Sequence, residues 1–147
     1  MLKSACQKNL TDNQGKIMTK GNKLNRILLV EDEPDIQTIA KLALEAVGGF
    51  EVEICSSGSE ALEKAPVFKP DLILMDVMMP GMDGPTTLKN LRQIADIVTI
   101  PIIFMTAKVQ PHEVNQYKKL GALDVIAKPF DPMKLASNIK NIWKDAQ

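Results

Sequence analysis

Short apolar segments alternate with amphipathic ones along most of this chain, from Arg26 onward. Five segments are rich in branched aliphatic residues and have the length of strands. They are RILLV at 26–30, FEVEIC at 50–55, DLILM at 71–75, IPIIFM at 100–105 and LDVIA at 123–127. Because most of them are continuously apolar, the pattern predicts a parallel sheet that is covered on both faces.

The segment after each strand has helical spacing, and capping residues indicate its ends. The first helix should begin at Pro34, a favoured first-turn residue, and stop at the glycines 48–49. Its inward face should carry the apolar residues Ile36, Ile39, Ala40, Ala43 and Val47. The second helix should follow a serine cap, Ser57 or Ser59, and end before Pro66.

Similar signals bound the last three helices. The third should follow the cap Asp83 and span roughly 85–95, and the fourth should span 111–120. Asp131 should cap the fifth, with Pro132 in its first turn. The inward-facing residues of the third and fifth helices should be Leu88, Leu91, Leu135, Ile139, Ile142 and Trp143. Alternating strands and helices predict an α/β fold, a doubly wound parallel sheet with helices on both faces.

Polar side chains follow four of the predicted strands. They are Glu31, Asp32 and Glu33 after the first strand, Asp76 after the third, Thr106 after the fourth and Lys128 after the fifth. Ligands of such sheets bind at the carboxyl ends of the strands, so these groups should converge there, with Asp76 exposed at the edge. Clustered carboxylates repel one another, and Mg²⁺ relieves that repulsion through oxygen ligands. With a hydroxyl and an ammonium group, the set suits phosphoryl transfer to an aspartate.

Each of these residues also has an ordinary structural explanation when it is taken singly. Asp32 and Thr106 can cap helices, and Lys128 can be a solvated surface charge. Asp76 is harder to explain in this way, because Asp83 already caps the helix that follows it. The prediction of a phosphoryl-transfer site therefore depends on the joint placement of these groups.

Four motifs, ILLVEDEPDI, DLILMDVMMPGMDG, PIIFMTA and VIAKPF, carry these residues in order. Through them the chain resembles the receiver domains of two-component response regulators, over about residues 25–145. The resemblance implies a flavodoxin-like (βα)5 three-layer sandwich with the strand order 2-1-3-4-5. It also implies a phosphoacceptor signalling protein rather than an enzyme. Such a protein takes a phosphoryl group from a sensor histidine kinase, a histidine phosphotransfer protein or a small phosphodonor.

The resemblance also implies a role for each site residue. Asp76 would accept the phosphoryl group, and Thr106 and Lys128 would contact its oxygens. The ligands of a Mg²⁺ ion would be Asp32 and Asp76 directly, Glu31 mainly through water, and Met78 through its backbone carbonyl. The peptide bond between Lys128 and Pro129 would be cis.

Three positions depart from the family's usual pattern. Val125 stands where many members have a switch Tyr or Phe, so a signal would travel through backbone and loop shifts. The face that responds would comprise the fourth helix, fifth strand and fifth helix, and it would meet a downstream protein or form a phosphorylation-dependent homodimer. Met78 and Lys108 stand where other members have side chains that position water, so phosphorylated Asp76 should not hydrolyse quickly.

Several other classes of protein share part of this pattern. The main alternative is a degenerate receiver that binds proteins independently of phosphorylation, although such a module should have lost a key side chain. A magnesium-dependent phosphohydrolase would need a second Asp in place of Met78. A flavin mononucleotide carrier would need a phosphate-binding loop where EDEPD repels phosphate. A purely structural acid cluster would leave its carboxylates unpaired, which costs stability.

Composition and charge bear on the partners and the compartment of the protein. A net charge of zero points to neither nucleic acid nor a membrane surface, and no apolar run approaches the ~18 residues of a membrane span. Only Cys6 and Cys55 are present, which indicates a reducing compartment such as the cytoplasm. Residues 1–24 carry five lysines and one aspartate, so we expect a flexible basic tail before a receiver domain at 25–147, with Met18 as an alternative start. No DNA-binding helix pair follows that domain, so a stand-alone receiver without direct nucleic-acid contact is expected.

Overall fold

The computed structural model describes residues 23–147, so the expected tail over 1–24 lies almost wholly outside the described residues. Five parallel strands form one sheet in the order β2-β1-β3-β4-β5. The strands are β1 (Arg26–Val30), β2 (Glu51–Cys55), β3 (Leu72–Asp76), β4 (Ile102–Thr106) and β5 (Asp124–Ala127). The predicted strands and the predicted doubly wound order are confirmed.

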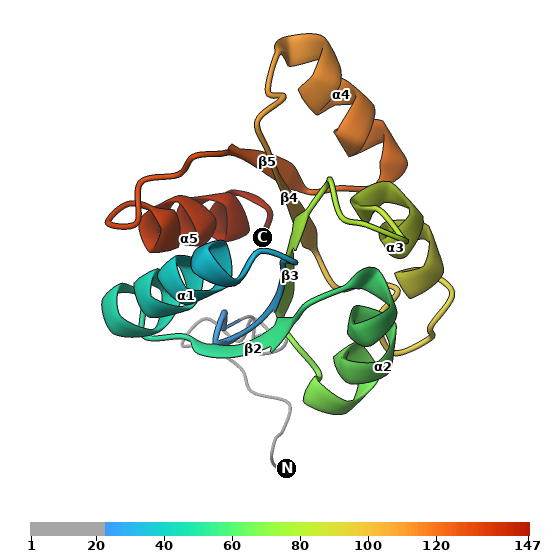
Figure 1. The fold of residues 1–147 in the computed structure, drawn as a ribbon, viewed down its shortest axis with the longest axis horizontal. Coiled ribbons are helices and arrows are strands. Elements are labelled where there is room, and N and C mark those ends of the chain that lie inside the picture. Colours follow the sequence, from blue (N-terminus) through green and yellow to red (C-terminus); the bar gives the residue numbers. More distant parts are fainter. Residues whose placement is uncertain (1–22) are drawn as a thin grey trace, which may run out of the picture.

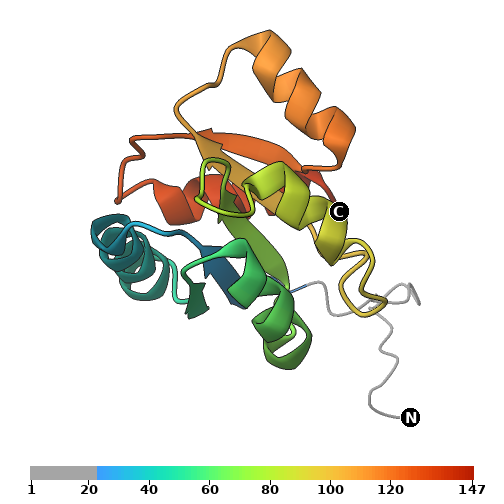
Figure 2. The ribbon, with the colours of Figure 1, turned by 45° about the vertical axis from the view of Figure 1, so that its right-hand side comes forward.

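Helices cover both faces of this sheet (Figures 1 and 2). On one face lie α1 (Pro34–Leu42), its π-helical continuation η2 (Ala43–Val47) and α5 (Leu135–Asp145). On the other face lie α2 (Gly58–Phe68) and α3 (Gly84–Leu91), and α4 (Pro111–Leu120) lies towards the β5 edge. The result is the predicted three-layer sandwich. No helix of residues 23–147 is both long enough and apolar enough to span a bilayer.

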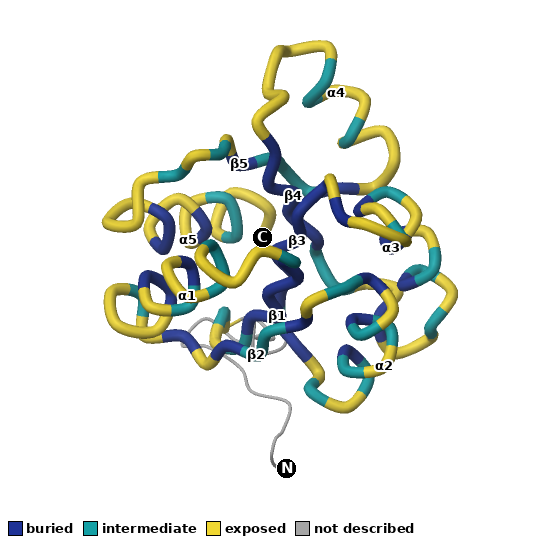
Figure 3. Tube along the Cα trace, viewed as in Figure 1, coloured by how far each residue is buried: buried dark blue, intermediate teal, exposed yellow. Residues whose placement is uncertain are grey.

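Residues of the strands alternate between two hydrophobic clusters, one on each face of the sheet. In β1, Ile27 and Leu29 pack towards α1 and α5, whereas Leu28 and Val30 pack towards α2 and α3. Figure 3 shows the same burial as a dark core along the central strands. β3 and β4 are buried at every position, and the last residue of each, Asp76 and Thr106, is its one polar residue.

The buried face of the first helix differs from the predicted one. Ala40 and Ala43 are buried as expected, but Ile39 and Val47 are 45% and 47% exposed. Beyond α1 the chain winds as a π-helix, whose wider turn rotates the later residues about the axis. Within this segment Leu44, which the regular spacing had not assigned to the inward face, is buried, whereas Val47 is not.

Two helices end at other residues than the sequence predicts. α2 continues through Pro66 to Phe68, so the proline lies inside the last turn of the helix and does not end it. α3 ends at Leu91 instead of near residue 95, and tighter turns follow it. The guanidinium of Arg92 stabilises these turns by donating to the carbonyls of Ile97 and Ile100.

Two of the predicted helix caps are confirmed and one is displaced. Ser57 accepts a hydrogen bond from the N–H of Glu60, and Asp83 accepts one from the N–H of Thr86. Asp131 accepts from the N–H of Met133 in a turn that precedes α5, which itself begins only at Leu135. The first-turn proline expected there lies in this turn as well.

Gly84 begins α3 directly behind the end of β3. A Cβ atom at this position would lie 2.7 Å from the carbonyl oxygen of Asp76 and 2.9 Å from the Cα of Val77. Both neighbours are backbone atoms, so they cannot move aside as a flexible side chain would. Close approach of α3 to the strand end therefore requires glycine.

We expect Gly84→Ala to destabilise the protein by about 1–3 kcal/mol, as overpacking of a core does. Lys89→Ala is the matched control, because Lys89 is an exposed residue of the same helix. Urea denaturation of both variants measures the effect. A Gly84→Ala protein that unfolds at the same urea concentration as the control would contradict this account of the α3 contact.

Candidate functional site

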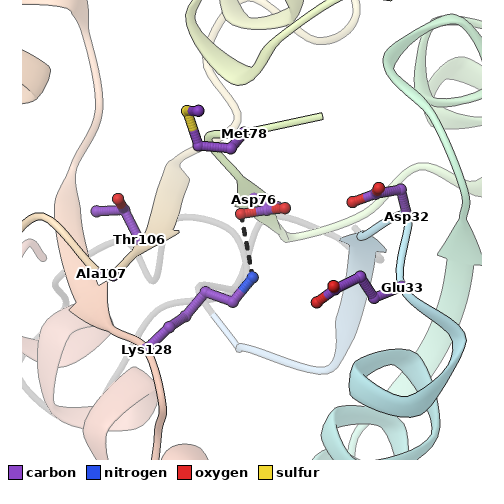
Figure 4. Close-up of a pocket in the computed structure, with 7 residues that line it drawn as sticks. All are labelled: Asp32, Glu33, Asp76, Met78, Thr106, Ala107 and Lys128. Carbon is purple, nitrogen blue, oxygen red and sulfur yellow. Dashed lines mark hydrogen bonds and ion pairs between the residues drawn. The ribbon is translucent and has the colours of Figure 1, made fainter. Parts of the chain in front are cut away.

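The carboxyl ends of four strands meet around one pocket of about 250 Å³ (Figure 4). The pocket is lined by Asp32, Glu33, Asp76, Met78, Thr106, Ala107 and Lys128. Every site residue named from the sequence except Glu31 thus lines it, and Glu31 lies directly behind. The convergence predicted from the strand ends is observed.

Asp76 is more deeply enclosed than we expected. We predicted a carboxylate exposed at the edge of the sheet, but Asp76 is only 4% exposed, so that prediction is wrong. It is the last residue of β3 and lies opposite Met105 of β4, whereas β1 ends opposite the preceding residue, Met75. Lys128 covers it from the β5 side, with Nζ 3.2 Å from Oδ1 of Asp76 (Figure 4).

Glu31 is completely buried and has both of its carboxylate oxygens occupied. Oε1 lies 3.2 Å from the ammonium group of Lys128, and Oε2 accepts a hydrogen bond of 3.1 Å from the N–H of Glu33. One ammonium group therefore joins Glu31 to Asp76 across the floor of the pocket.

A third carboxylate, that of Asp32, lies close to the two that contact Lys128. Oxygen atoms of Glu31, Asp32 and Asp76 lie within 4.8 Å of one another. Burial raises the pKa of Asp76 and of Glu31, although Lys128 opposes the shift in both. Burial by itself would lower the pKa of Lys128, but the two carboxylates together raise it. The cluster has an excess of negative charge, and its hard oxygen donors fit a divalent cation such as Mg²⁺.

Thr106 and Met78 line the pocket in different ways. The hydroxyl of Thr106 is buried and accepts a hydrogen bond of 3.1 Å from the N–H of Lys108. The backbone N–H of Met78 donates to the carboxylate of Asp76, whereas the side chain of Met78 is 68% exposed. The peptide bond between Lys128 and Pro129 is cis, as the resemblance implied.

Glu33, which was expected near the strand ends but was assigned no role there, also lines the pocket. Its place in the acidic run after β1 was the available signal. Its backbone N–H fixes Glu31, and its carboxylate adds a further negative charge to the rim.

Comparison with known proteins identifies the family. The family model of the response regulator receiver domain matches residues 27–140. The chain belongs to this family. Receiver domains are signalling modules of two-component systems rather than enzymes in their own right. They interact with histidine kinases and generally bind Mg²⁺ at an acidic pocket.

Relatives and solved structures agree with this assignment. The chain is 39% identical over 122 residues to the alkaline phosphatase synthesis transcriptional regulatory protein PhoP of Bacillus subtilis, covering 83% of this chain and 50% of PhoP. It is 34% identical to the DNA-binding response regulator MtrA of Mycolicibacterium smegmatis, covering 78% and 49% of the two chains. The structure of chemotaxis protein CheY4 of Vibrio cholerae has a TM-score of 0.75 and 31% identity, over 82% of this chain and 99% of that one.

The chain spans about half the length of the curated relatives it matches. Several of these relatives are named as transcriptional or DNA-binding regulators. The expectation of no direct nucleic-acid contact is therefore not supported for the whole protein. The expectation of a stand-alone receiver stays a prediction.

The buried acids predict how stability depends on pH in magnesium-free buffer. Their folded-state pKa values are raised, so their protonation favours the folded state, and this contribution is lost as pH rises from about 4 through the raised values. Asp76→Asn removes one buried charge. We expect this variant to have a higher urea midpoint than the wild-type protein at pH 7.5. The difference between the two midpoints should become smaller towards pH 4.

Asp96→Asn is the control, since Asp96 is exposed and lies outside the pocket. Its urea midpoint should follow that of the wild-type protein across the same pH range. A gap between Asp76→Asn and wild type that stays constant with pH would contradict the assigned electrostatics.

Proposed function

We propose that this chain is a phosphoacceptor that takes a phosphoryl group onto Asp76 from a phosphohistidine of a sensor histidine kinase or a histidine phosphotransfer protein. The observation that carries the proposal is the placement of Asp76. A carboxylate at the closed end of β3 faces the ammonium group of Lys128 and adjoins two further acids. In this proposal residues 25–147 form the receiver unit, and the protein acts in the cytoplasm.

The transfer exchanges one bond to phosphorus for another. A carboxylate oxygen of Asp76 attacks the phosphorus, and the bond from phosphorus to the imidazole nitrogen of the donor breaks. The electron pair of that bond leaves with the imidazole. Lys128 Nζ, already 3.2 Å from Asp76, is placed to donate to a phosphoryl oxygen, and the hydroxyl of Thr106 can turn to do the same.

Mg²⁺ fits the donor set of the pocket. Asp32 and Asp76 would hold it directly, Glu31 mainly through water, and Met78 through its backbone carbonyl. When bound, Mg²⁺ offsets negative charge on the carboxylates and on phosphoryl oxygens. Burial raises the pKa values of Asp76 and Glu31, and Lys128 offsets this effect only in part, which supports the assignment of a further cation to the pocket.

A switch follows from the contacts of Thr106. Its hydroxyl accepts from the N–H of Lys108, so a turn of the hydroxyl towards a phosphoryl group releases the first residues of the loop before α4. α4 buries none of its residues, which leaves it free to change its packing. Since Val125 offers no aromatic ring, the face of α4, β5 and α5 would respond through this loop. That face would meet a downstream protein or a second copy of the chain.

Incubation with phosphoramidate and Mg²⁺ should add one phosphoryl group to the chain, measured as intact mass. The addition should require Mg²⁺, because the acids otherwise repel the donor. Asp76→Asn, which keeps the shape of the side chain but lacks the nucleophile, should show none.

Absence of any addition, under conditions in which another receiver domain is labelled, would contradict the proposal. The alternative would then gain support, namely a degenerate receiver that binds its partner independently of phosphorylation. Equal labelling of the Asp76→Asn variant would show instead that another residue accepts the phosphoryl group.

Hydrolysis of the phosphorylated protein should be slow, with a half-life of minutes or longer. Neither Met78 nor Lys108 presents a group that holds a water molecule in line with the phosphorus. Met78→Asn should hydrolyse severalfold faster, because its amide can orient that water. Met133→Asn is the control, since Met133 is an exposed methionine that does not line the pocket. Loss of the phosphoryl group from the wild-type protein within seconds would contradict this prediction.

A further inference from the structure

Gln37 connects the acidic loop to a second loop at the edge of the sheet. It lies in α1 and is partly buried. Its amide nitrogen donates to the carbonyl oxygen of Glu31 at 2.6 Å and to the hydroxyl of Ser56 at 3.2 Å. One side chain thus bridges the loop after β1 and the loop after β2.

The carbonyl of Glu31 belongs to the peptide group that leads into Asp32. A peptide group is planar, so a hydrogen bond that fixes its oxygen also fixes the direction in which the chain enters Asp32. The N–H of Glu31 is held as well, by the carbonyl of Cys55 at 2.9 Å. Asp32 itself has no ion pair with a residue of 23–147. The backbone therefore sets the point from which this side chain enters the pocket.

Ser56 gives Gln37 a firm anchor. The N–H of Ser56 donates to the carboxylate of Glu60 at 2.5 Å, and this hydrogen bond is the main cause of the lowered pKa of Glu60. Glu60 pairs in turn with Lys64 at 3.1 Å, and Lys64 pairs with Glu53 of β2 at the same distance. The bridge made by Gln37 therefore ties the acidic loop to the frame of α2 and β2.

We propose that Gln37 is a positioning residue of the acidic pocket, which sets its affinity for Mg²⁺ by holding the peptide group between Glu31 and Asp32. The inference rests on the proposed function insofar as it takes the pocket to bind Mg²⁺. Gln37 does not line the pocket and touches neither the metal position nor the reacting oxygen of Asp76.

Gln37→Met tests this role, since methionine has a similar length but no hydrogen-bond donor. Titration of the full chain with MgCl₂ by calorimetry should give a dissociation constant about tenfold higher than for the wild-type protein, the lower end of what partners of metal ligands contribute. Thermal unfolding in EDTA should match the Thr38→Ala control. Thr38 is the next residue of α1 and is exposed, and among residues 23–147 its hydroxyl bonds to the carbonyl of Pro34 within its own helix.

A second readout separates positioning from general damage. The rate of phosphorylation by phosphoramidate should need more Mg²⁺ to reach half its maximum in Gln37→Met, but the maximum rate should be close to that of the wild-type protein. Gln37→Asn retains the amide on a shorter side chain and should behave like Gln37→Met. It replaces that variant in the test if the methionine variant does not fold.

The outcomes distinguish this inference from the proposed function. A wild-type protein that binds no Mg²⁺ would overturn both. A wild-type protein that binds Mg²⁺ as tightly as its Gln37 variants do would overturn the positioning role alone. A fall in the maximum rate at saturating Mg²⁺ would also overturn it, because Gln37 would then act on something other than the metal site.

Discussion

A single ammonium group, Lys128 Nζ, faces two buried carboxylates, and the rest of the site depends on this arrangement. Burial opposes the charged forms of Glu31 and Asp76, and a single cation compensates only part of that effect. Asp32 adds another carboxylate within reach of both. The protein thus maintains a local excess of negative charge that a divalent cation and a transferred phosphoryl group together can satisfy. Such an arrangement suits a site whose net charge changes when a cation or a phosphoryl group binds.

The parallel sheet makes this arrangement possible between residues that are distant along the chain. Lys128 and Glu31 are separated by 97 positions, yet their side chains are 3.2 Å apart. In register, Asp76 lies beside Met105 and Thr106 lies beside Ala127, so neighbouring strands end within one residue of each other. Gly84 brings α3 close behind the end of β3, where a side chain would collide with the backbone. The fold therefore encloses Asp76 while it leaves one side open to the pocket.

Much of the fold and most members of the pocket could be predicted from the sequence. Strands buried on both faces appear as short apolar runs, and caps such as Ser57 and Asp83 are recognisable one at a time. The order of the polar strand ends then predicted the members of the pocket. Apolar runs and helix caps depend on residues that are neighbours in the sequence, which is why they could be predicted from it.

Features that depend on contacts between segments were missed. The burial of Asp76 arises from β4 and from Lys128, which belong to other parts of the chain, so the sequence neighbours of Asp76 gave no sign of it. The π-helical turn after α1 changed which residues face inward, and a regular helical period cannot anticipate it. Gln37 belongs to no recognisable motif, because its proposed positioning role depends on hydrogen bonds to two loops that are distant in the sequence.

The central claim is that the enclosed carboxylate of Asp76 accepts the phosphoryl group. Reductive trapping tests it most directly, because borohydride reduces an aspartyl phosphate and leaves free carboxylates unchanged. The full chain would be phosphorylated with phosphoramidate and Mg²⁺, reduced, digested and mapped by mass spectrometry. The account predicts one reduced aspartate, at position 76. Reduction at another acid, or a phosphorylated chain with no reduced aspartate, would contradict it.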